Sequence, residues 1–460
     1  MADEGIADGN VFDDLSCFVW GSDLNEDNFK RWSQGFVFSQ DEPSALVQLE
    51  GGPCAVIASV QAHLIKNVLF CDGISKHESS GWRQITAEQA TDLLARTLCQ
   101  MLQMVKADDN IALVLMKDHP PCLSGQESQE KSQKMPDSTE FSNYHKTICQ
   151  QSLRNLTSKD LHSSLRSIKC RNIEETRSLI TRNTNIFESH FGVLLFLYSI
   201  ILTRGIDTIK QEMEDSNEPL VDPDFGHGSQ TLINLLITGY GVSHIWDHSK
   251  NIASLELRGI PKQCNIGFLT LLEAHRYCEV GSFLKGPEYP IWLLGSETHL
   301  SVLFSTERDL SGTEQPVDKA KRVFKAFDQQ ENGFIDSSKL IDVLAELNLE
   351  TDPDYVEFMR SRLDPDSVGI ILLPNFLDDF FPRESSSLGR TSPFTVFHYN
   401  GLGMRTDGES TRKVIYTMGI ASIEPTDFSS VAELDIVTCL KTKWPGLSVE
   451  WQSKYPPTLN

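Results

Sequence analysis

Residues 48–70 read QLEGGPCAVIASVQAHLIKNVLF, and we expect the fold to be built around this stretch. Behind the glycines, apolar residues recur at the spacing of one helix face, at Val56, Ile57, Val60, Leu64 and Val68. Proline is favoured at the first helical position, where its missing N–H is not needed. The pattern therefore predicts a buried helix from Cys54 to Phe70 that Pro53 starts.

Cys54 is the candidate nucleophile, because the first turn of a helix offers unpaired amides and the positive end of the helix dipole. Such a position favours the thiolate, the attacking form of cysteine. Gln48, six residues earlier, is expected to form an oxyanion hole with the Cys54 amide. Gly51 and Gly52 let a substrate backbone approach closely. The competing interpretation is a buried packing cysteine, the commonest fate of a free thiol, but the glycine-proline start and the upstream glutamine favour catalysis.

A cysteine nucleophile needs a base, and the chain offers twelve histidines. His299 is the first candidate because it begins a predicted strand, 299–304, and rigid strand ends position side chains well. The alternative is a hydrogen-bonded strand histidine without a catalytic role; His398, in a later strand, is the second candidate base. A third, orienting residue stays open between Asn400, which also forms an Asn-Gly turn signal, and Glu297, which lies close to a turn.

The hydrophobic period changes along the chain from helical in the first half to strand-like after residue 290. Strand patterns on both sides of a helical segment suggest that this segment is inserted into one sheet, so we expect an α+β fold. The predicted parts are an acidic disordered tail (1–12), the first part of a catalytic core (13–317, with a flexible loop at 123–140), an inserted helical pair (318–384), a linker (385–393) and the second part of the core (394–460).

The inserted segment contains two loops of one pattern, DQQENGFI at 328–335 and DPDSVGII at 364–371. Both follow the loop of an EF-hand, which normally binds calcium through carboxylates and ends on a bidentate Glu at position 12. That position holds Lys339 in the first loop and Asn375 in the second. We therefore expect a degenerate EF-hand pair that keeps the helix packing without calcium, and we predict no metal site.

The composition excludes several classes of partner. With 41 Lys and Arg against 64 Asp and Glu, the formal charge is −23, which disfavours nucleic acid and anionic membranes and favours a basic partner. The N-terminal residues lack a secretory signal, and the longest apolar run, 191–203, is shorter than a bilayer requires, so a cytoplasmic or nuclear location is expected. Ten cysteines without a CxxC indicate reduced thiols, and no cofactor is predicted.

Several stretches together resemble the MINDY deubiquitinases, in particular their EF-hand-bearing branch. They are QGFVFSQDEPSALVQLEGGPCAVIASVQAHL, NLLITGYGVSHIWDH, IGFLTLLEAHRYCEVGS, IWLLGSETHLSVLF and, after the EF-hand pair, FTVFHYNGL. The resemblance implies a papain-like cysteine-protease core that cleaves isopeptide bonds in polyubiquitin, preferring lysine-48 linkages. It also implies that the nucleophile is Cys54, the oxyanion residue Gln48 and the base His299.

The same substrate suits the residues around the candidate nucleophile. The ubiquitin tail ends Leu-Arg-Gly-Gly, so a narrow channel beside Gly51 and Gly52 would admit it, and its arginine would need an acid, for which Asp41, Glu42 and Glu50 are candidates. A second hypothesis is a catalytically latent ubiquitin- or partner-binding module that uses the EF-hand pair. A third is an acyl-transfer enzyme that acts on a different amide.

Overall fold

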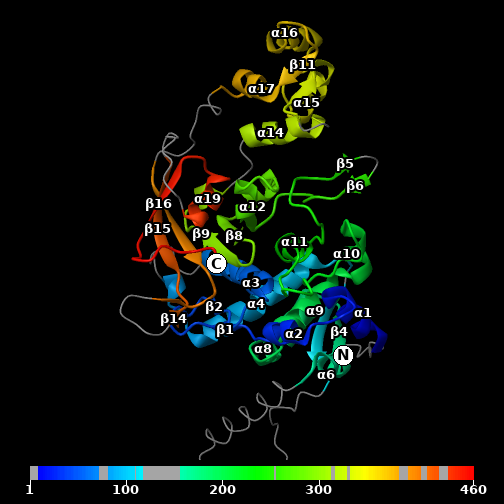
Figure 1. Ribbon diagram of the computed structural model, residues 1–460, viewed down its shortest axis with the longest axis vertical. Helices are drawn as coiled ribbons and strands as arrows, with labels where there is room; N and C mark the ends of the chain where they lie inside the picture. The colour runs from blue at the N-terminus through cyan, green and yellow to red at the C-terminus, as the bar shows by residue number, and fades with distance from the viewer. Residues whose placement is uncertain are drawn as a thin grey trace, which may run out of the picture.

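The architecture of the chain is mixed α/β, with helices gathered around α3 (Cys54–Lys66) and one six-stranded sheet packed against them (Figure 1). It is seen in a computed structural model that describes residues 9–71, 81–108, 110–117, 156–252, 255–311, 316–328, 332–382, 392–405, 412–423 and 434–460. The loop predicted at 123–140 and most of the linker predicted at 385–393 lie outside the described residues.

Helix α3 forms where the apolar spacing predicts it and continues into the π-helical turn η1 (Asn67–Cys71). All residues of α3 except Lys66 are buried, so the helix must be covered on every side. Cys54–Cys71 is long and apolar enough to cross a membrane, yet 78 % of it is buried inside the fold, as is usual for the central helix of a core.

The first half contains further helices, of which those at 87–105, 192–204 and 230–238 pack against α3, and pairs of short strands. The helices are α1 (Gly9–Trp20), α2 (Glu26–Trp32), η2 (Gly81–Arg83), α4 (Ala87–Val105), α6 (Ser158–Ser164), α7 (Ile173–Arg182), α8 (Thr184–Phe187), α9 (Gly192–Arg204), α10 (Ile206–Glu212) and α11 (Gln230–Thr238). The two-stranded pairs are β1 (Val37–Phe38) with β2 (Leu46–Val47), β3 (Ile111–Met116) with β4 (Leu165–Cys170), and β5 (Lys250–Ile252) with β6 (Leu255–Leu257).

The main sheet has the strand order β16-β15-β12-β9-β8-β7. Its strands are β7 (Gly267–Thr270), β8 (Ile291–Gly295), β9 (Leu300–Phe304), β12 (Phe394–Tyr399), β15 (Thr417–Ile423) and β16 (Leu447–Trp451), with the short helices α12 (Leu271–Ala274), α13 (Ser282–Lys285), η3 (Arg308–Leu310) and α19 (Asp435–Lys441) and the pair β13 (Met404–Arg405) and β14 (Arg412–Lys413) beside them. Only β7 and β8 pair in parallel; the other neighbours are antiparallel.

Strands β8 and β9 form the predicted hairpin, and both are buried along their whole length. The sheet is covered on both faces, because Leu293 and Val302 belong to the core around α3, whereas Leu294 and Leu303 belong to a second hydrophobic cluster with α19. Successive side chains of β8 and β9 therefore enter two different hydrophobic cores. These strands do not alternate between buried and solvent-exposed side chains, as a strand with one face in solvent would.

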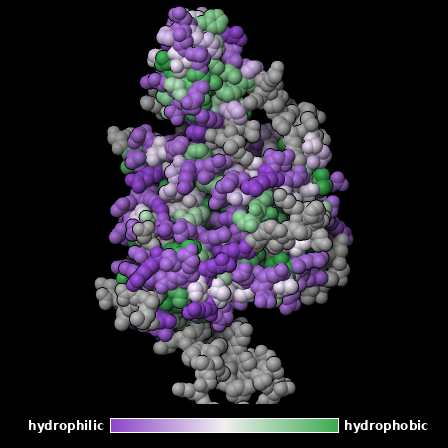
Figure 2. All heavy atoms as spheres, turned by 180° about the vertical axis from the view of Figure 1, so that it is seen from behind, coloured by the Kyte–Doolittle hydropathy of each residue, from purple (hydrophilic) through white to green (hydrophobic). Residues whose placement is uncertain are grey.

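A module of helices lies in sequence between β9 and β12, which are neighbours in the sheet. It consists of α14 (Pro316–Phe327), β10 (Phe334–Asp336), η4 (Ser337–Lys339), α15 (Leu340–Glu346), α16 (Pro353–Leu363), β11 (Ile370–Leu372) and α17 (Leu373–Phe380). The module has its own hydrophobic core and stands above the main body in Figures 1 and 2. Lys325 pairs with Glu279, and the Arg322 guanidinium lies 5.1 Å from the ring centroid of Phe283, so α14 rests on the main body.

The N-terminal boundary differs from the prediction. Helix α1 begins at Gly9, inside the stretch 1–12 that was expected to be a disordered tail, and Phe12 is buried in the main core. Burying that aromatic side chain and its neighbour Leu15 outweighs the acidic composition of the segment. Residues 1–8 lie outside the described residues.

Candidate active site

Cys54 is the first residue of α3 and is 4 % exposed. Its Sγ lies 3.8 Å from the carbonyl oxygen of Gly52, and the backbone amide of Leu300 is near enough to lower the pKa of the thiol. Leu300 is the first residue of β9 and follows His299 directly in the sequence. Helix α3 packs against β9, and this packing places Cys54 near the start of that strand. The structure therefore brings the thiol to the start of the strand that carries the candidate base.

The thiol is harder to ionise than the sequence pattern suggests. Burial raises the pKa of Cys54 from 9.0 to about 11, and the amides of Leu300, Ala55 and Cys54 itself lower it only in part. The expectation of an easily formed thiolate at the helix start is therefore wrong for the free protein, since desolvation of the charge outweighs the amides. The Cys54 thiol of the free protein is therefore largely protonated at pH 7.

His299 ends the turn between β8 and β9, and its side chain is buried. Its Nε2 lies 2.8 Å from the carbonyl oxygen of Asn400. Because a carbonyl only accepts, Nε2 carries the proton, and the neutral ring keeps Nδ1 free to receive another. Burial lowers the pKa of His299 below 6.5, hydrogen bonds to Asn400 oppose this, and the charge of His227 lowers it further, so the ring is neutral at pH 7.

Asn400 joins His299 to the segment that precedes the nucleophile. It is buried directly after β12, and the chain bends at its neighbour Gly401, which has a φ of +81°. The predicted Asn-Gly hairpin turn is wrong, because β12 pairs with β9 and β15 and not with the strand that follows it. The Gly401 carbonyl accepts from the backbone N–H of Gln48 at 2.9 Å. The bend at these two residues presents the Asn400 carbonyl to the imidazole.

The other two candidates lie less favourably. Glu297 is exposed on the β8–β9 turn. His398 is buried, and its Nε2 lies 2.9 Å from the hydroxyl of Ser301. Burial lowers the pKa of His398 to about 3, so this ring stays uncharged inside the sheet.

Gln48 is buried, and its Nε2 donates to the carbonyl oxygen of Glu50 at 3.0 Å. An amide nitrogen has two hydrogens, so one remains for a substrate oxygen. Gln34 holds the same segment, since its Oε1 accepts from the N–H of Leu49 at 2.9 Å and its Nε2 donates to the Glu50 carbonyl at 3.0 Å. The backbone that leads to the nucleophile is thus fixed by two glutamines.

The two glycines have different surroundings. Gly51 is exposed, and a Cβ added to it would meet no atom within 4 Å. Gly52 is buried at a φ of +126°, and a Cβ there would lie 3.0 Å from the ring of Trp32. Gly52 is therefore required by the fold, whereas the open space at Gly51 is available to a ligand.

A loop at 223–228 lies beside the nucleophile and was not found from the sequence. Three side chains of α2 hold its carbonyls: Asn28 donates to Pro223 at 2.7 Å, Arg31 to Phe225 at 2.7 Å, and Trp32 to Gly226 at 2.8 Å. A Cβ on Gly228 would lie 2.7 Å from the Cβ of Ala55, and a charge on His227 would lower the pKa of His299. No local motif marks this loop, because α2 and α3 bring it to the site through long-range contacts.

The three acidic candidates for a substrate arginine are unequal. Glu42 is buried and pairs with Arg83, so it is wrong as a substrate contact. Asp41 lies 3.5 Å from Lys413. Glu50 is exposed next to Gly51 and has no ion-pair partner within the described residues. Glu50 is the acid left for a basic ligand.

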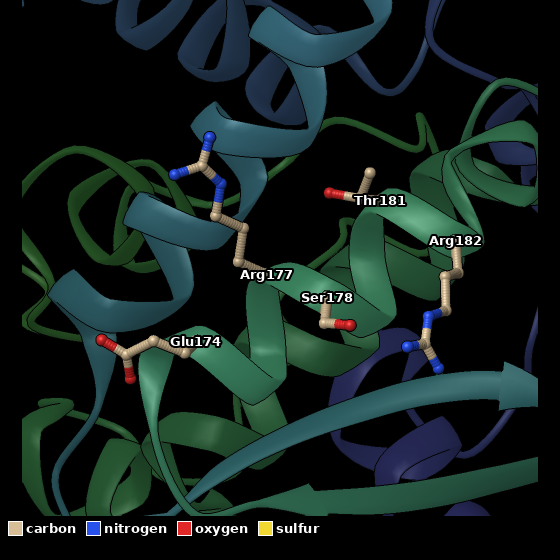
Figure 3. A pocket seen from close by; sticks show the side chains of 5 residues that line it. All are labelled: Glu174, Arg177, Ser178, Thr181 and Arg182. Atoms are coloured by element: carbon tan, nitrogen blue, oxygen red, sulfur yellow. The ribbon is translucent and has the colours of Figure 1, made fainter.

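A surface hollow on α7 lies apart from this site. It is lined by Glu174, Arg177, Ser178, Thr181 and Arg182. Figure 3 shows that their side chains spread apart instead of converging on one point. Within the described ranges, no group of three or more His, Cys, Asp or Glu side chains is placed to hold a metal ion.

A thiol at the start of a buried helix that packs against a strand directly preceded by a histidine suits a thiol-dependent hydrolase. The family described as "Deubiquitinating enzyme MINDY-3/4, conserved domain" matches residues 18–325. "Ubiquitin carboxyl-terminal hydrolase MINDY-3" of Homo sapiens is 42 % identical over 97 % of this chain and 99 % of its own. The homolog of Drosophila melanogaster is 38 % identical over 97 % of this chain and 82 % of its own. No solved structure matches the chain significantly.

The chain therefore belongs to the MINDY-3/4 family of deubiquitinating enzymes, which confirms the resemblance seen in the sequence.

We expect Cys54 in the free protein to react slowly with iodoacetamide at pH 7 and faster at each step up to pH 9 and beyond. The reason is that burial raises its pKa, so the reactive thiolate accumulates only at high pH. Mass spectrometry of the Cys54 peptide measures the rate, with the exposed Cys17 as an internal reference. A rate that is already maximal at pH 7 would contradict this prediction.

Proposed function

We propose that the chain hydrolyses isopeptide bonds in polyubiquitin, with a preference for lysine-48 linkages, through Cys54 as nucleophile and His299 as base. The observation that carries the proposal is the 2.8 Å hydrogen bond from His299 Nε2 to the Asn400 carbonyl, together with the contact of the thiol with the Leu300 amide. The first fixes the tautomer that accepts a proton, and the second links the thiol to the residue next to that ring.

The reaction follows from a protonated thiol and a neutral imidazole. As Sγ attacks the carbonyl carbon of the ubiquitin C-terminal glycine, His299 Nδ1 takes the thiol proton, and the developing oxyanion is held by Gln48 and the Cys54 amide. His299 then gives the proton to the leaving lysine amine. A water molecule, activated by the same imidazole, hydrolyses the thioester and restores the thiol.

In this proposal, Gly51 lines the entrance for the Gly-Gly end of ubiquitin. Its exposed backbone and the open space around it support that role. Glu50 lies beside it and would receive the arginine of the ubiquitin tail. The overall charge of −23 would steer a basic partner toward the site.

We also propose that the main body is a papain-like core and that the module at 316–382 is a degenerate EF-hand pair. Support for the second part comes from the two loops, whose strands β10 and β11 pair antiparallel. The Asp328 carboxylate accepts the N–H of Gly333 at 2.7 Å, and the Asp364 carboxylate accepts that of Gly369 at 2.7 Å. Lys339, at position 12, lies 3.3 Å from Asp342. The two loops thus share one local hydrogen bond, from the glycine at position 6 to the aspartate at position 1.

Calcium titration tests the EF-hand assignment. We expect no binding heat at micromolar calcium, because a lysine replaces the bidentate glutamate of the first loop and the second loop has lost several of its oxygen ligands. Isothermal calorimetry of the full chain measures this. A dissociation constant in the micromolar range would overturn the assignment.

A ubiquitin C-terminal electrophile and lysine-48-linked tetraubiquitin test the catalytic proposal. We expect the probe to label the chain, Cys54→Ala to abolish both labelling and cleavage, and Gln48→Ala to lower kcat about a hundredfold to a thousandfold, as loss of an oxyanion donor does. Tetraubiquitin linked through lysine 63, as a parallel substrate, measures the linkage preference.

The outcomes separate the hypotheses. If the chain binds tetraubiquitin but neither cleaves it nor is labelled by the probe, the latent ubiquitin-binding module is favoured. Cleavage of a small amide without any reaction with ubiquitin favours a different acyl-transfer enzyme.

Graded substitutions at Gly51 test the channel. Because a Cβ there meets no atom, Gly51→Ala and Gly51→Leu are expected to leave thermal unfolding nearly unchanged while kcat/KM on polyubiquitin falls progressively, by at least tenfold for leucine. Alkylation of Cys54 by iodoacetamide serves as the control, since this small reagent does not need the channel. Unchanged cleavage by Gly51→Leu would remove Gly51 from the substrate path.

A further inference from the structure

The geometry points to residues Thr458–Asn460, which we name the C-terminal clamp, as positioning residues for the catalytic base. We propose that the clamp holds the two turns that orient His299 and that the rate of the chemical step depends on it. This inference rests on the proposed function. Figure 1 places the C-terminal end of the chain near β8, β9 and α3, beside the candidate site.

The first turn held by the clamp is Ser296–His299. The Asn460 Oδ1 accepts hydrogen bonds from the hydroxyl of Ser296 and from that of Thr298, the latter at 3.2 Å. The Ser296 hydroxyl oxygen in turn accepts the backbone N–H of His299 at 3.0 Å. The His299 carbonyl oxygen, 3.2 Å from the same hydroxyl, is the alternative acceptor of its single hydrogen. Asn460 therefore competes for a hydroxyl whose oxygen holds the backbone N–H of the base.

The second turn held by the clamp is that of Asn400. The Asn400 Nδ2 donates to the carbonyl oxygen of Thr458 at 3.1 Å, and the Asn400 Oδ1 accepts the N–H of Leu402 at 3.3 Å. With its side chain held on both sides, Asn400 keeps its own carbonyl pointed at His299 Nε2. The same short segment thus supports both partners of the hydrogen bond that sets the tautomer of the base.

Leu459 anchors the clamp. Its side chain is 1 % exposed and belongs to the hydrophobic cluster that contains Leu294 and Leu303, on the two strands that flank the His299 turn. The side chains on either side of it, Thr458 and Asn460, are exposed. One buried residue therefore fixes the place of two polar contacts on the rim of the site.

The position of a general base matters to the rate more than its presence does, because a misplacement of about 1 Å lowers the rate by as much as a hundredfold. The clamp contributes no atom to the reaction. Its loss is expected to lower kcat and to leave KM nearly unchanged, since none of its contacts faces Gly51 or Glu50, where the substrate is proposed to bind.

The test uses the full chain with lysine-48-linked tetraubiquitin. Asn460 is exposed, so Asn460→Ala is not expected to affect folding, and we expect it to lower kcat threefold to tenfold at unchanged KM. Asn460→Asp keeps an oxygen acceptor and is expected to restore most of the rate. Leu459→Ala, which releases the anchor, is expected to lower kcat at least tenfold. Tyr455→Ala, an exposed residue of the same C-terminal segment, is the matched control and should behave as the unmodified chain.

The kinetic results distinguish a failure of the clamp inference from a failure of the proposed function. Suppose that the unmodified chain cleaves tetraubiquitin and that Asn460→Ala and Leu459→Ala both keep its kcat. The role of the clamp is then overturned, and the proposed function stands. Equal losses in Asn460→Ala and Asn460→Asp also overturn it, because the acceptor oxygen is then irrelevant. An unmodified chain that neither reacts with the ubiquitin electrophile nor cleaves defeats the proposed function itself. If Leu459→Ala fails to fold, the two Asn460 variants decide.

Discussion

The structure depends on the packing of one helix, α3, against the β8–β9 hairpin. A helix that is apolar on every side is stable only where other elements cover it completely, and α4, α9, α11 and the sheet do so here. That requirement fixes where the first turn of α3 lies relative to the start of β9. The position of the Cys54 thiol relative to His299 is therefore set by the burial of hydrophobic side chains.

The same burial determines the state of those groups. Desolvation raises the pKa of the Cys54 thiol to about 11 and lowers that of His299, so both are neutral at pH 7. An exposed catalytic pair would exist partly as thiolate and imidazolium and would react with many electrophiles. In the proposed mechanism, a neutral, enclosed pair would react only when a bound carbonyl allows the proton to move as the bond forms. Slow reaction with small reagents and selectivity for a substrate that fits thus have one physical cause.

Helix α3, the β8–β9 hairpin and the candidate His299 could be predicted from local sequence, because each depends on apolar spacing and turn signals within a few residues. The contact of Asn400 with His299 depends instead on the register of β12 against β9, in which Tyr399 faces Val302 across 97 residues of sequence. The loop at 223–228 and the C-terminal clamp have no motif and are positioned by tertiary contacts alone. The raised pKa of Cys54 escaped the sequence argument for a similar reason, since helix position is local and desolvation is a property of the whole fold.

The module between β9 and β12 leaves the site intact because it enters and leaves at the opposite end of these strands. There, the Ser305 hydroxyl donates to the Thr395 carbonyl at 2.6 Å, and the Glu307 carboxylate accepts the Thr395 N–H at 2.8 Å, which closes the strand pair below the insertion. From Ser305 to His299 the strand rises about 20 Å at about 3.3 Å per residue. The points where the module joins the sheet therefore lie far along the strands from Cys54 and His299, and α14 contacts the main body at Glu279 and Phe283.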